Sequence, residues 1–208
     1  MINTKIPKIS LTLLAVICLF GVVKAQSKTK KLDFQEGDIV FQASGSRQAP
    51  LLALLTASEF THCGVISIKN GKPYVIEAVS KVREIPLDQW VTKGKGKKYA
   101  VGRSKINLSK GDKKALILYA RKQINKDYDF LFQWSDKTMY CSELVWKAYQ
   151  NAGIEISIRK KFSDYPIEMA IAKSEIKKRY KNKIFNKNEV VVSPVDIYRS
   201  EKIEIIHQ

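Results

Sequence analysis

The sequence predicts an α+β fold in which an antiparallel sheet packs against helices, and three observations support this. Residues 61–79 form two β-rich runs joined by Asn70-Gly71. Residues 141–151 carry apolar side chains at the spacing of one helix face. Shorter β-rich runs at 82–85 and 99–103 extend the expected sheet. The repeat of apolar positions distinguishes a strand from a helix, and here both repeats occur in one chain.

The turn at Asn70-Gly71 predicts a tight β-hairpin. A two-residue type I′ turn needs positive φ at both central residues, which asparagine and glycine tolerate best. Such a turn places Lys69 opposite Lys72, and Ile66 then faces Val75. The register of the whole hairpin therefore follows from the turn.

The same register brings two polar residues together on one face of the hairpin. His62 and Glu77 become diagonal neighbours at a backbone spacing of ~7–8 Å, which a long side chain can bridge. Gly64 lies opposite Glu77 and leaves space for it. Because side chains alternate along a strand, Cys63 points to the other face. We therefore expect Cys63 to be a buried free thiol, separated from the His62 face.

The helix over residues 141–151 begins at a cysteine and ends before Gly153. One face of it carries the side chains of Cys141, Leu144, Val145 and Ala148. This spacing is typical of a helix face that packs on a core. The Cys141 thiol should therefore point inward, toward the sheet.

The other elements follow from shorter signals. We expect strands at 37–41, 189–192 and 203–206, and helices at 50–58, at 109–124 and after Ser193-Pro194. The segment 125–137 is irregular and aromatic, and the charged region beyond residue 153 predicts no element before 189.

Residues 1–25 have the pattern of a secretory signal peptide. Lys5 and Lys8 precede an apolar run over 9–23, and Ala25 completes a small-residue cleavage site. The run is about 15 residues long, short of the ~20 that a spanning helix needs. We therefore expect an exported protein, periplasmic or secreted, with no transmembrane segment after cleavage and a single domain over 26–208. The alternative is an uncleaved N-terminal anchor.

The charge balance is strongly basic, with 37 Lys and Arg against 20 Asp and Glu and a net charge of +17. Such a balance favours anionic partners, and for an exported chain we expect an anionic envelope surface that binds a basic face. The basic runs at 93–98 and 177–179 lack interleaved aromatic residues, so no nucleic acid partner is expected. A basic surface that is merely solvated is the alternative.

Three residues form a candidate catalytic group. A thiol at a helix N-terminus is stabilised as the thiolate by the helix dipole, which makes Cys141 a candidate nucleophile. His62 is the natural base, because the chain's second histidine, His207, is penultimate. An acid such as Glu77 within an apolar strand needs a partner, and the register supplies His62. Taken singly, a buried cysteine and a strand histidine are more often ordinary core residues.

The residues around this group resemble the permuted branch of the papain-like hydrolases of NlpC type, and within it the YiiX/YebB-like enzymes. The resemblance rests on His-Cys-Gly-Val-Ile at 62–66, Tyr-Val-Ile-Glu-Ala at 74–78 and Tyr-Cys-Ser-Glu-Leu-Val-Trp-Lys-Ala-Tyr at 140–149. It implies a circularly permuted papain-like fold with a partly barrel-like sheet, in which the histidine strand precedes the cysteine helix.

The resemblance also implies roles for single residues. Cys141 matches the nucleophile, His62 the base and Glu77 the third polar member. Tyr128 is similar to a tyrosine that stabilises the oxyanion, together with the backbone N–H of Cys141. Tyr140 is a competing candidate by adjacency, and a tyrosine of the core is the other interpretation of Tyr128.

We therefore expect a cysteine amidase or peptidase that forms an acyl-enzyme, with no cofactor and no metal. The expected substrate is a peptide or a peptidoglycan fragment of the cell envelope. An acylated small molecule or lipid is the alternative, because the hydrophobic residues 51–55 could line a pocket for it. Two non-enzymatic alternatives are a binder of acyl chains or envelope fragments and an adhesion module that acts through its charge.

Overall fold

The structure, a computed structural model, describes residues 32–46 and 48–208. The expected signal peptide lies outside the described residues. Residues 32–208 form one compact unit. Among the described residues, none of the helices has the length and apolar character needed to cross a membrane.

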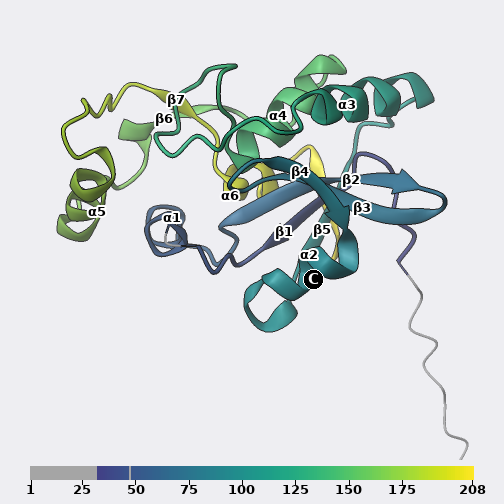
Figure 1. The fold of residues 1–208 in the computed structure, drawn as a ribbon, viewed down its shortest axis with the longest axis horizontal. Coiled ribbons are helices and arrows are strands. Elements are labelled where there is room, and N and C mark those ends of the chain that lie inside the picture. Colours follow the sequence, from purple (N-terminus) through teal and green to yellow (C-terminus); the bar gives the residue numbers. More distant parts are fainter. Residues whose placement is uncertain (1–31, 47) are drawn as a thin grey trace, which may run out of the picture. The chain divides into compact units, whose positions relative to one another are not determined.

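A six-stranded antiparallel sheet forms the centre of the fold (Figure 1). Its strand order is β4-β3-β2-β1-β5-β8, so that β4 and β8 form the edges of an open sheet. The strands are β1 (Ile39–Gln42), β2 (His62–Lys69), β3 (Lys72–Ala78), β4 (Val82–Pro86), β5 (Ala100–Ser104) and β8 (Ile203–His207). A separate two-stranded sheet joins β6 (Lys160–Lys161) to β7 (Val190–Val191).

The β2–β3 hairpin has the predicted register. Its pairs run from Val65 opposite Ile76 to Lys69 opposite Lys72. The turn residues Asn70 and Gly71 have φ angles of 50° and 72°. Positive φ at both positions is what a type I′ turn requires, so the local turn chemistry sets the pairing of the two strands.

Helices cover both faces of the sheet. Helix α2 (Leu87–Lys93) lies on one face, while α3 (Lys110–Lys122) and α4 (Cys141–Asn151) lie on the other (Figure 1). The α2 face buries a small cluster that includes Val40, Ile66, Val75 and Trp90. The α4 face buries the main core, in which β2 and β3 contribute Cys63, Val65 and Ile76. Alternation along the strands thus divides their side chains between two cores.

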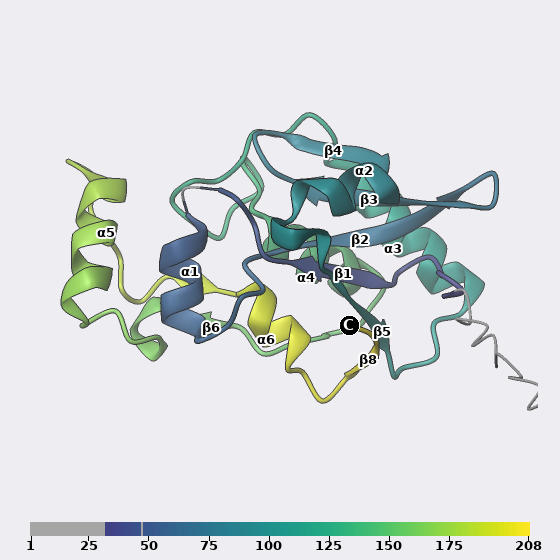
Figure 2. The same cartoon turned by 90° about the horizontal axis from the view of Figure 1, so that it is seen from below.

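Two further helices lie side by side at one end of the sheet (Figure 2). These are α1 (Ala49–Thr56) and α5 (Ala170–Tyr180), and they share a small apolar cluster of Leu51, Leu55, Ile167 and Ala172. The last helix, α6 (Pro194–Tyr198), begins after Ser193, whose side chain accepts a hydrogen bond from the Asp196 N–H.

Most predicted elements are present, and two helices were not predicted. Helix α4 has the predicted bounds, and α3 follows Ser109, which caps it by accepting from the Asp112 N–H. Helix α2 directly follows β4 and has only seven residues, too few for a clear apolar repeat. Helix α5 buries only Ala172 and Tyr180, so its sequence carries almost no amphipathic pattern.

Candidate active site

Cys141 is the first residue of α4, and its side chain is 3% exposed. The preceding residue, Tyr140, is extended, with φ −99° and ψ 167°, so that the helix starts abruptly at the cysteine. Glu143 accepts a hydrogen bond from the Tyr140 N–H at 3.3 Å and holds this first turn. The free amides and the dipole of the helix start favour a negative sulfur there.

His62 and Glu77 are in direct contact, as the hairpin register predicts. The Nε2 atom of His62 lies 2.6 Å from Oε2 of Glu77, and both side chains are almost fully buried. Since this bond occupies Nε2, the Nδ1 atom is the ring nitrogen left for Cys141. A built Cβ on Gly64 would lie 2.5 Å from Val75 Cγ1 and 3.4 Å from Glu77 Cβ, so a side chain at this position would crowd both strands.

Two further residues hold Glu77, and the sequence analysis missed both. Arg83 donates to Oε1 from Nε at 2.9 Å and from Nη2 at 2.7 Å, and Trp90 Nε1 donates to Oε2 at 2.9 Å. The Trp90 ring also stacks on His62 at 6.1 Å between centroids. Arg83 lies opposite Glu77 in the β3–β4 ladder, so extending the register to β4 would have found it.

The pKa values of these groups follow from their partners. Burial raises the pKa of the Glu77 carboxyl, but the bonds from His62 and Arg83 outweigh burial and hold it below its usual range. Burial lowers the pKa of His62, while hydrogen bonds to Cys141 and Glu77 raise it, and the result is about 10. The imidazole is therefore protonated at neutral pH.

The Cys141 thiol has a pKa well below its usual range. The largest cause is a hydrogen bond from Cys63; burial opposes it, and a hydrogen bond from His62 adds to it. A thiolate beside an imidazolium is the reactive pair of cysteine hydrolases. The two residues at which the sequence places nucleophile and base thus have pKa shifts that favour the thiolate and the imidazolium.

The position of Cys63 corrects one expectation. Cys63 and Cys141 are both buried free thiols, as expected, but they share the same apolar core, and Cys63 donates to Cys141. We expected the opposite face of the hairpin to separate Cys63 from the nucleophile. Helix α4 packs on the face of the hairpin that carries Cys63. His62 points to the other face, but it is the first residue of β2 and can approach the Cys141 thiol from the end of the strand.

Tyr128 lies beside the nucleophile. Burial raises the pKa of its hydroxyl well above the usual range, and the negative charge of the nearby Cys141 raises it further. The single O–H proton is donated to Oε1 of Gln48 at 3.3 Å, so the hydroxyl has to turn away from Gln48 before it can donate toward Cys141 or a substrate oxygen. The competing residue, Tyr140, is engaged elsewhere, because its hydroxyl accepts from the Val192 N–H at 3.2 Å. The charge of Cys141 is a leading cause of the raised pKa of Tyr128, whereas for Tyr140 the charge of Glu143 comes before it.

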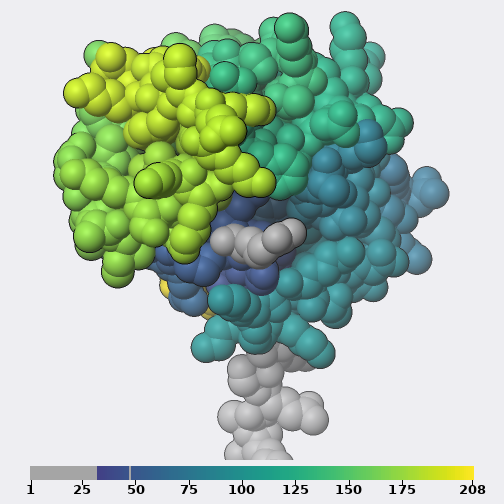
Figure 3. Space-filling model, turned by 60° about the vertical axis from the view of Figure 1, so that its left-hand side comes forward, coloured from purple at the N-terminus to yellow at the C-terminus, as the bar shows by residue number. Residues whose placement is uncertain are grey.

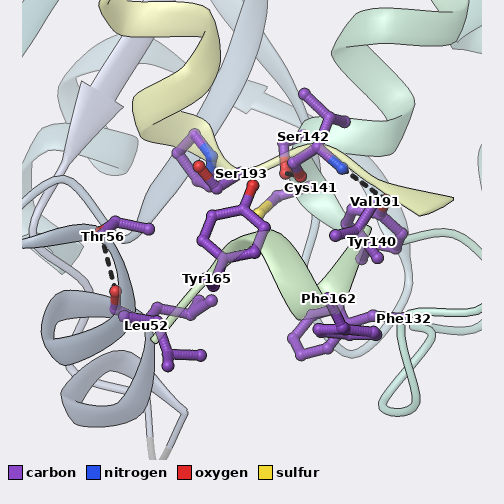
Figure 4. A pocket seen from close by; sticks show the side chains of 13 residues that line it. Leu52, Thr56, Phe132, Tyr140, Cys141, Ser142, Phe162, Tyr165, Val191 and Ser193 are labelled. Carbon is purple, nitrogen blue, oxygen red and sulfur yellow. Dashed lines mark hydrogen bonds between the residues drawn. The ribbon is translucent and has the colours of Figure 1, made fainter. Parts of the chain in front are cut away.

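An apolar pocket opens beside Cys141 (Figure 4). It encloses about 430 Å³ with its open mouth included. Side chains from α1, from the 125–140 segment and from the region between β6 and α6 form its wall: Leu52, Leu55, Thr56, Phe132, Tyr140, Phe162, Tyr165, Val191, Val192 and Pro194. Apart from the Cys141 thiolate, none of its lining residues is charged, so it suits an apolar group next to the reacting bond.

Three other acids of the chain have structural roles. Glu143 lies 2.8 Å from Lys147 Nζ, without hydrogen-bond alignment, and its burial raises its pKa to about 7. Asp38 binds Arg103 at 2.7 Å, and Asp196 caps α6. None of these carboxylates belongs to the group at Cys141.

Comparison with known proteins assigns the family. Residues 33–207 match the family described as permuted papain-like amidase enzyme, YaeF/YiiX, C92 family. The chain belongs to the permuted papain-like amidases. It is 38% identical over 173 residues to the uncharacterised protein YiiX of Escherichia coli K12, covering 83% of this chain and 85% of that protein.

A solved structure of this amidase family is also similar. It is the crystal structure of the metalloprotein YiiX from Escherichia coli O157:H7, with a TM-score of 0.81 and 36% identity over 85% of this chain and 98% of that one. The permuted papain-like fold and the α+β class predicted from the sequence are therefore confirmed.

The word metalloprotein in that title raises the question of a metal in this amidase. Within residues 32–46 and 48–208, no three His, Cys, Asp or Glu side chains are placed to hold an ion. The Nε2 atom of His62 and both carboxylate oxygens of Glu77 are already bonded to protein groups. The described residues at the site therefore do not fit a metal.

Proposed function

We propose that this permuted papain-like amidase cleaves an amide bond through Cys141, His62 and Glu77. The observation that carries the proposal is the 2.6 Å bond between Glu77 and His62, together with the pKa shifts that His62 and Cys141 cause in each other at the start of α4. Arg83 and Trp90 fix the carboxylate, so the imidazole has one orientation. A nucleophile, a base and an orienting group are the parts that covalent acyl transfer requires.

The reaction proceeds in two halves. The Cys141 thiolate attacks the amide carbonyl carbon, and a tetrahedral oxyanion forms. The C–N bond then breaks, the amine leaves with the proton from His62, and a thioester remains. Water attacks the thioester while His62 takes its proton, and the acid leaves as the thiolate is restored.

Two donors are available for the oxyanion. The Cys141 backbone N–H is free of an intrahelical partner because it lies at the helix start. The Tyr128 hydroxyl is the second donor, since it lies beside the sulfur. Donors placed where charge develops are worth more than donors that must reorganise.

We propose a cell-envelope substrate, a peptide or peptidoglycan fragment, for an exported enzyme. The pattern of residues 1–25 and the excess of basic residues in the rest of the chain support this, since envelope material is anionic. The apolar lining beside Cys141 narrows the proposal to a substrate with an apolar group next to the scissile bond.

The same lining favours a second candidate, hydrolysis or transfer of a fatty acyl group. Leu52 and Leu55, from the segment in which we expected an acyl-binding wall, do line the pocket. The two candidates share the nucleophile and differ in the group that fills the pocket.

The test is mass spectrometry of substrates incubated with the wild type and with Cys141→Ala. The panel contains peptidoglycan stem peptides, peptide amides with Ala, Leu or Phe next to the amide, and N-acyl amines of rising chain length. We expect hydrolysis only by the wild type, fastest for an apolar flank, with a thioester adduct on Cys141 after rapid quenching.

The non-catalytic alternatives predict a different result. A binder of acyl chains or an adhesion module would bind members of the panel equally in both proteins and release no product. Product that persists in Cys141→Ala would also overturn the proposal.

A further inference from the structure

Most of the exposed large apolar side chains lie in helix α5 or in the segments that precede and follow it in the chain, together with Phe130. Within the described part of the chain, seven large apolar residues are exposed, and five of them lie in residues 130 and 158–184. These five are Phe130, Ile158, Met169, Ile171 and Ile184, with exposed fractions from 43% to 92%. Ile184 is the most exposed of all, at 92%. Single exposed apolar residues are normal, but a group on one segment marks an interaction surface.

The same segment is strongly basic. Residues 158–189 contain ten Lys and Arg against four Asp and Glu. Some are paired, such as Lys173 with Glu168 and Lys178 with Glu175. Within residues 32–46 and 48–208, no acidic side chain lies at ion-pair distance from Lys177, Lys181, Lys183 or Lys187. Their charge is therefore available to an outside partner.

Contacts at the C-terminal end of α5 bring the apolar and the basic residues together. Arg179 donates to the Phe130 carbonyl at 3.3 Å, and the Tyr180 hydroxyl donates to the Leu131 carbonyl at 2.5 Å. The neighbour of Ile184, Phe185, packs against Tyr180 at 5.0 Å between ring centroids. Phe130 and Ile184 thus lie near the C-terminal end of α5, where the chain also carries Lys177, Lys181 and Lys183.

We propose that this surface, formed by Phe130, α5 and residues 181–187, docks the protein on an anionic lipid bilayer. A bilayer is the partner that offers both chemistries: phosphate headgroups for the lysines and hydrocarbon for the isoleucine and phenylalanine side chains. A soluble polyanion would bind the lysines but would leave Ile184 and Phe130 in water.

Docking would bring the apolar pocket close to the lipid. The segment between β6 and β7 forms one lobe in Figure 3, and it supplies Phe162 and Tyr165 to the pocket at Cys141. Helix α5 itself packs on α1, which supplies Leu52 and Leu55 to the same pocket. The docking surface is independent of the proposed chemistry, because none of its residues lies in the group at Cys141.

The first experiment is sedimentation of the full chain with vesicles. Vesicles of phosphatidylglycerol with phosphatidylcholine are compared with pure phosphatidylcholine at low and high salt. We expect Lys177→Glu/Lys181→Glu to lower binding to anionic vesicles about 10-fold or more, because each basic residue near the surface contributes to binding. The matched control is Lys110→Glu/Lys114→Glu on α3, which changes the same charge elsewhere and should leave binding unchanged.

A second experiment localises the contact. Tryptophan is introduced as Ile184→Trp and, as the control, as Ile106→Trp, and its fluorescence is measured with brominated lipids. We expect quenching at position 184 only, a result that membrane binding by residues 1–31 could not produce. Circular dichroism verifies that all variants are folded, and hydrolysis of a soluble substrate should be unchanged in them.

Three results would overturn the inference. One is equal loss of vesicle binding in the α5 and α3 charge variants. Another is the absence of quenching at position 184. The third is binding to soluble polyphosphate that falls in Lys177→Glu/Lys181→Glu while Ile184→Ser has no effect on vesicle binding, which would identify a surface for soluble polyanions instead.

Discussion

The two faces of the β2–β3 hairpin differ in chemistry, although the strands are the same. On the α2 face, the Glu77 carboxylate receives hydrogen bonds from His62, Arg83 and Trp90. On the α4 face, Cys63 lies among the apolar side chains of the main core. The nucleophile packs on the apolar face, and the group that orients the base is buried on the polar one.

The difference shows how one of two neighbouring thiols is made reactive. Burial raises the pKa of the Cys63 thiol well above its usual range, and the negative charge of Cys141 adds to this. Cys141, at the helix start, has the Cys63 thiol and the imidazolium as donors, and its pKa falls. His62 connects the two faces because it is the first residue of β2, where the strand ends and its ring can contact both.

The largest loss of activity should come from replacing His62, the residue that connects the two faces. In His62→Gln the thiolate loses its cationic partner, so the pKa of Cys141 should rise and amide hydrolysis should fall by about 10³-fold or more. Steady-state kinetics with an amide substrate measure the loss. Alkylation by iodoacetamide at neutral pH should fall in parallel, and unchanged alkylation would show that the two faces act separately.

A smaller loss of activity is expected when Glu77, on the polar α2 face, is replaced. Glu77→Gln keeps the shape but removes the charge that holds the imidazolium, and activity should fall by roughly 10²-fold, below the ~10⁴-fold of the equivalent change in a serine triad. The pKa of His62 should fall as well, which NMR titration measures. Arg83→Gln is the matched control, and its effect should be smaller because Trp90 and His62 still hold the carboxylate.

The role of Tyr128 is tested by removing only its hydroxyl. Tyr128→Phe should lower kcat by about 10²-fold, as loss of one oxyanion donor does, with little change in the rate of Cys141 alkylation. Tyr140→Phe is the control, since its hydroxyl binds Val192. If the two variants lose equal activity while their thermal stability also falls, Tyr128 is a packing residue.

The smallest effect is expected when Cys63, on the apolar α4 face, is replaced, and it concerns the pKa of Cys141. Cys63→Ala removes a donor to the thiolate, so the pKa of Cys141 should rise and its alkylation profile should move to higher pH. Cys63→Ser keeps a hydroxyl donor and should shift the profile less. The wild-type profile should already be near its plateau at neutral pH, unlike an ordinary thiol with a pKa of about 8.5. Identical profiles in all three proteins would exclude Cys63 from the charge balance.

Much of the site was predictable because its determinants are local. The turn at Asn70-Gly71 sets the hairpin register, and the contact of His62 with Glu77 follows from it. The start of α4 at Cys141 follows from the apolar repeat. Arg83 was within reach of the same reasoning, had the register been carried into β4.

Trp90 and the pocket at Cys141 were not predictable in this way. Trp90 lies on a seven-residue helix whose position depends on packing against the sheet. The pocket is lined by residues from α1 and from segments between residues 132 and 194, which meet α1 only in the folded protein.

The sequence by itself determined the strand pairing of the hairpin, the helix that begins at Cys141 and the identity of the three polar residues, since turns and apolar repeats act between close neighbours in the chain. Only the tertiary structure decided which face of the sheet receives that helix, and so placed Cys63 beside the nucleophile. The strand pattern did not choose between the two faces, because each carries enough apolar side chains to be buried. The packing of distant helices chose between them.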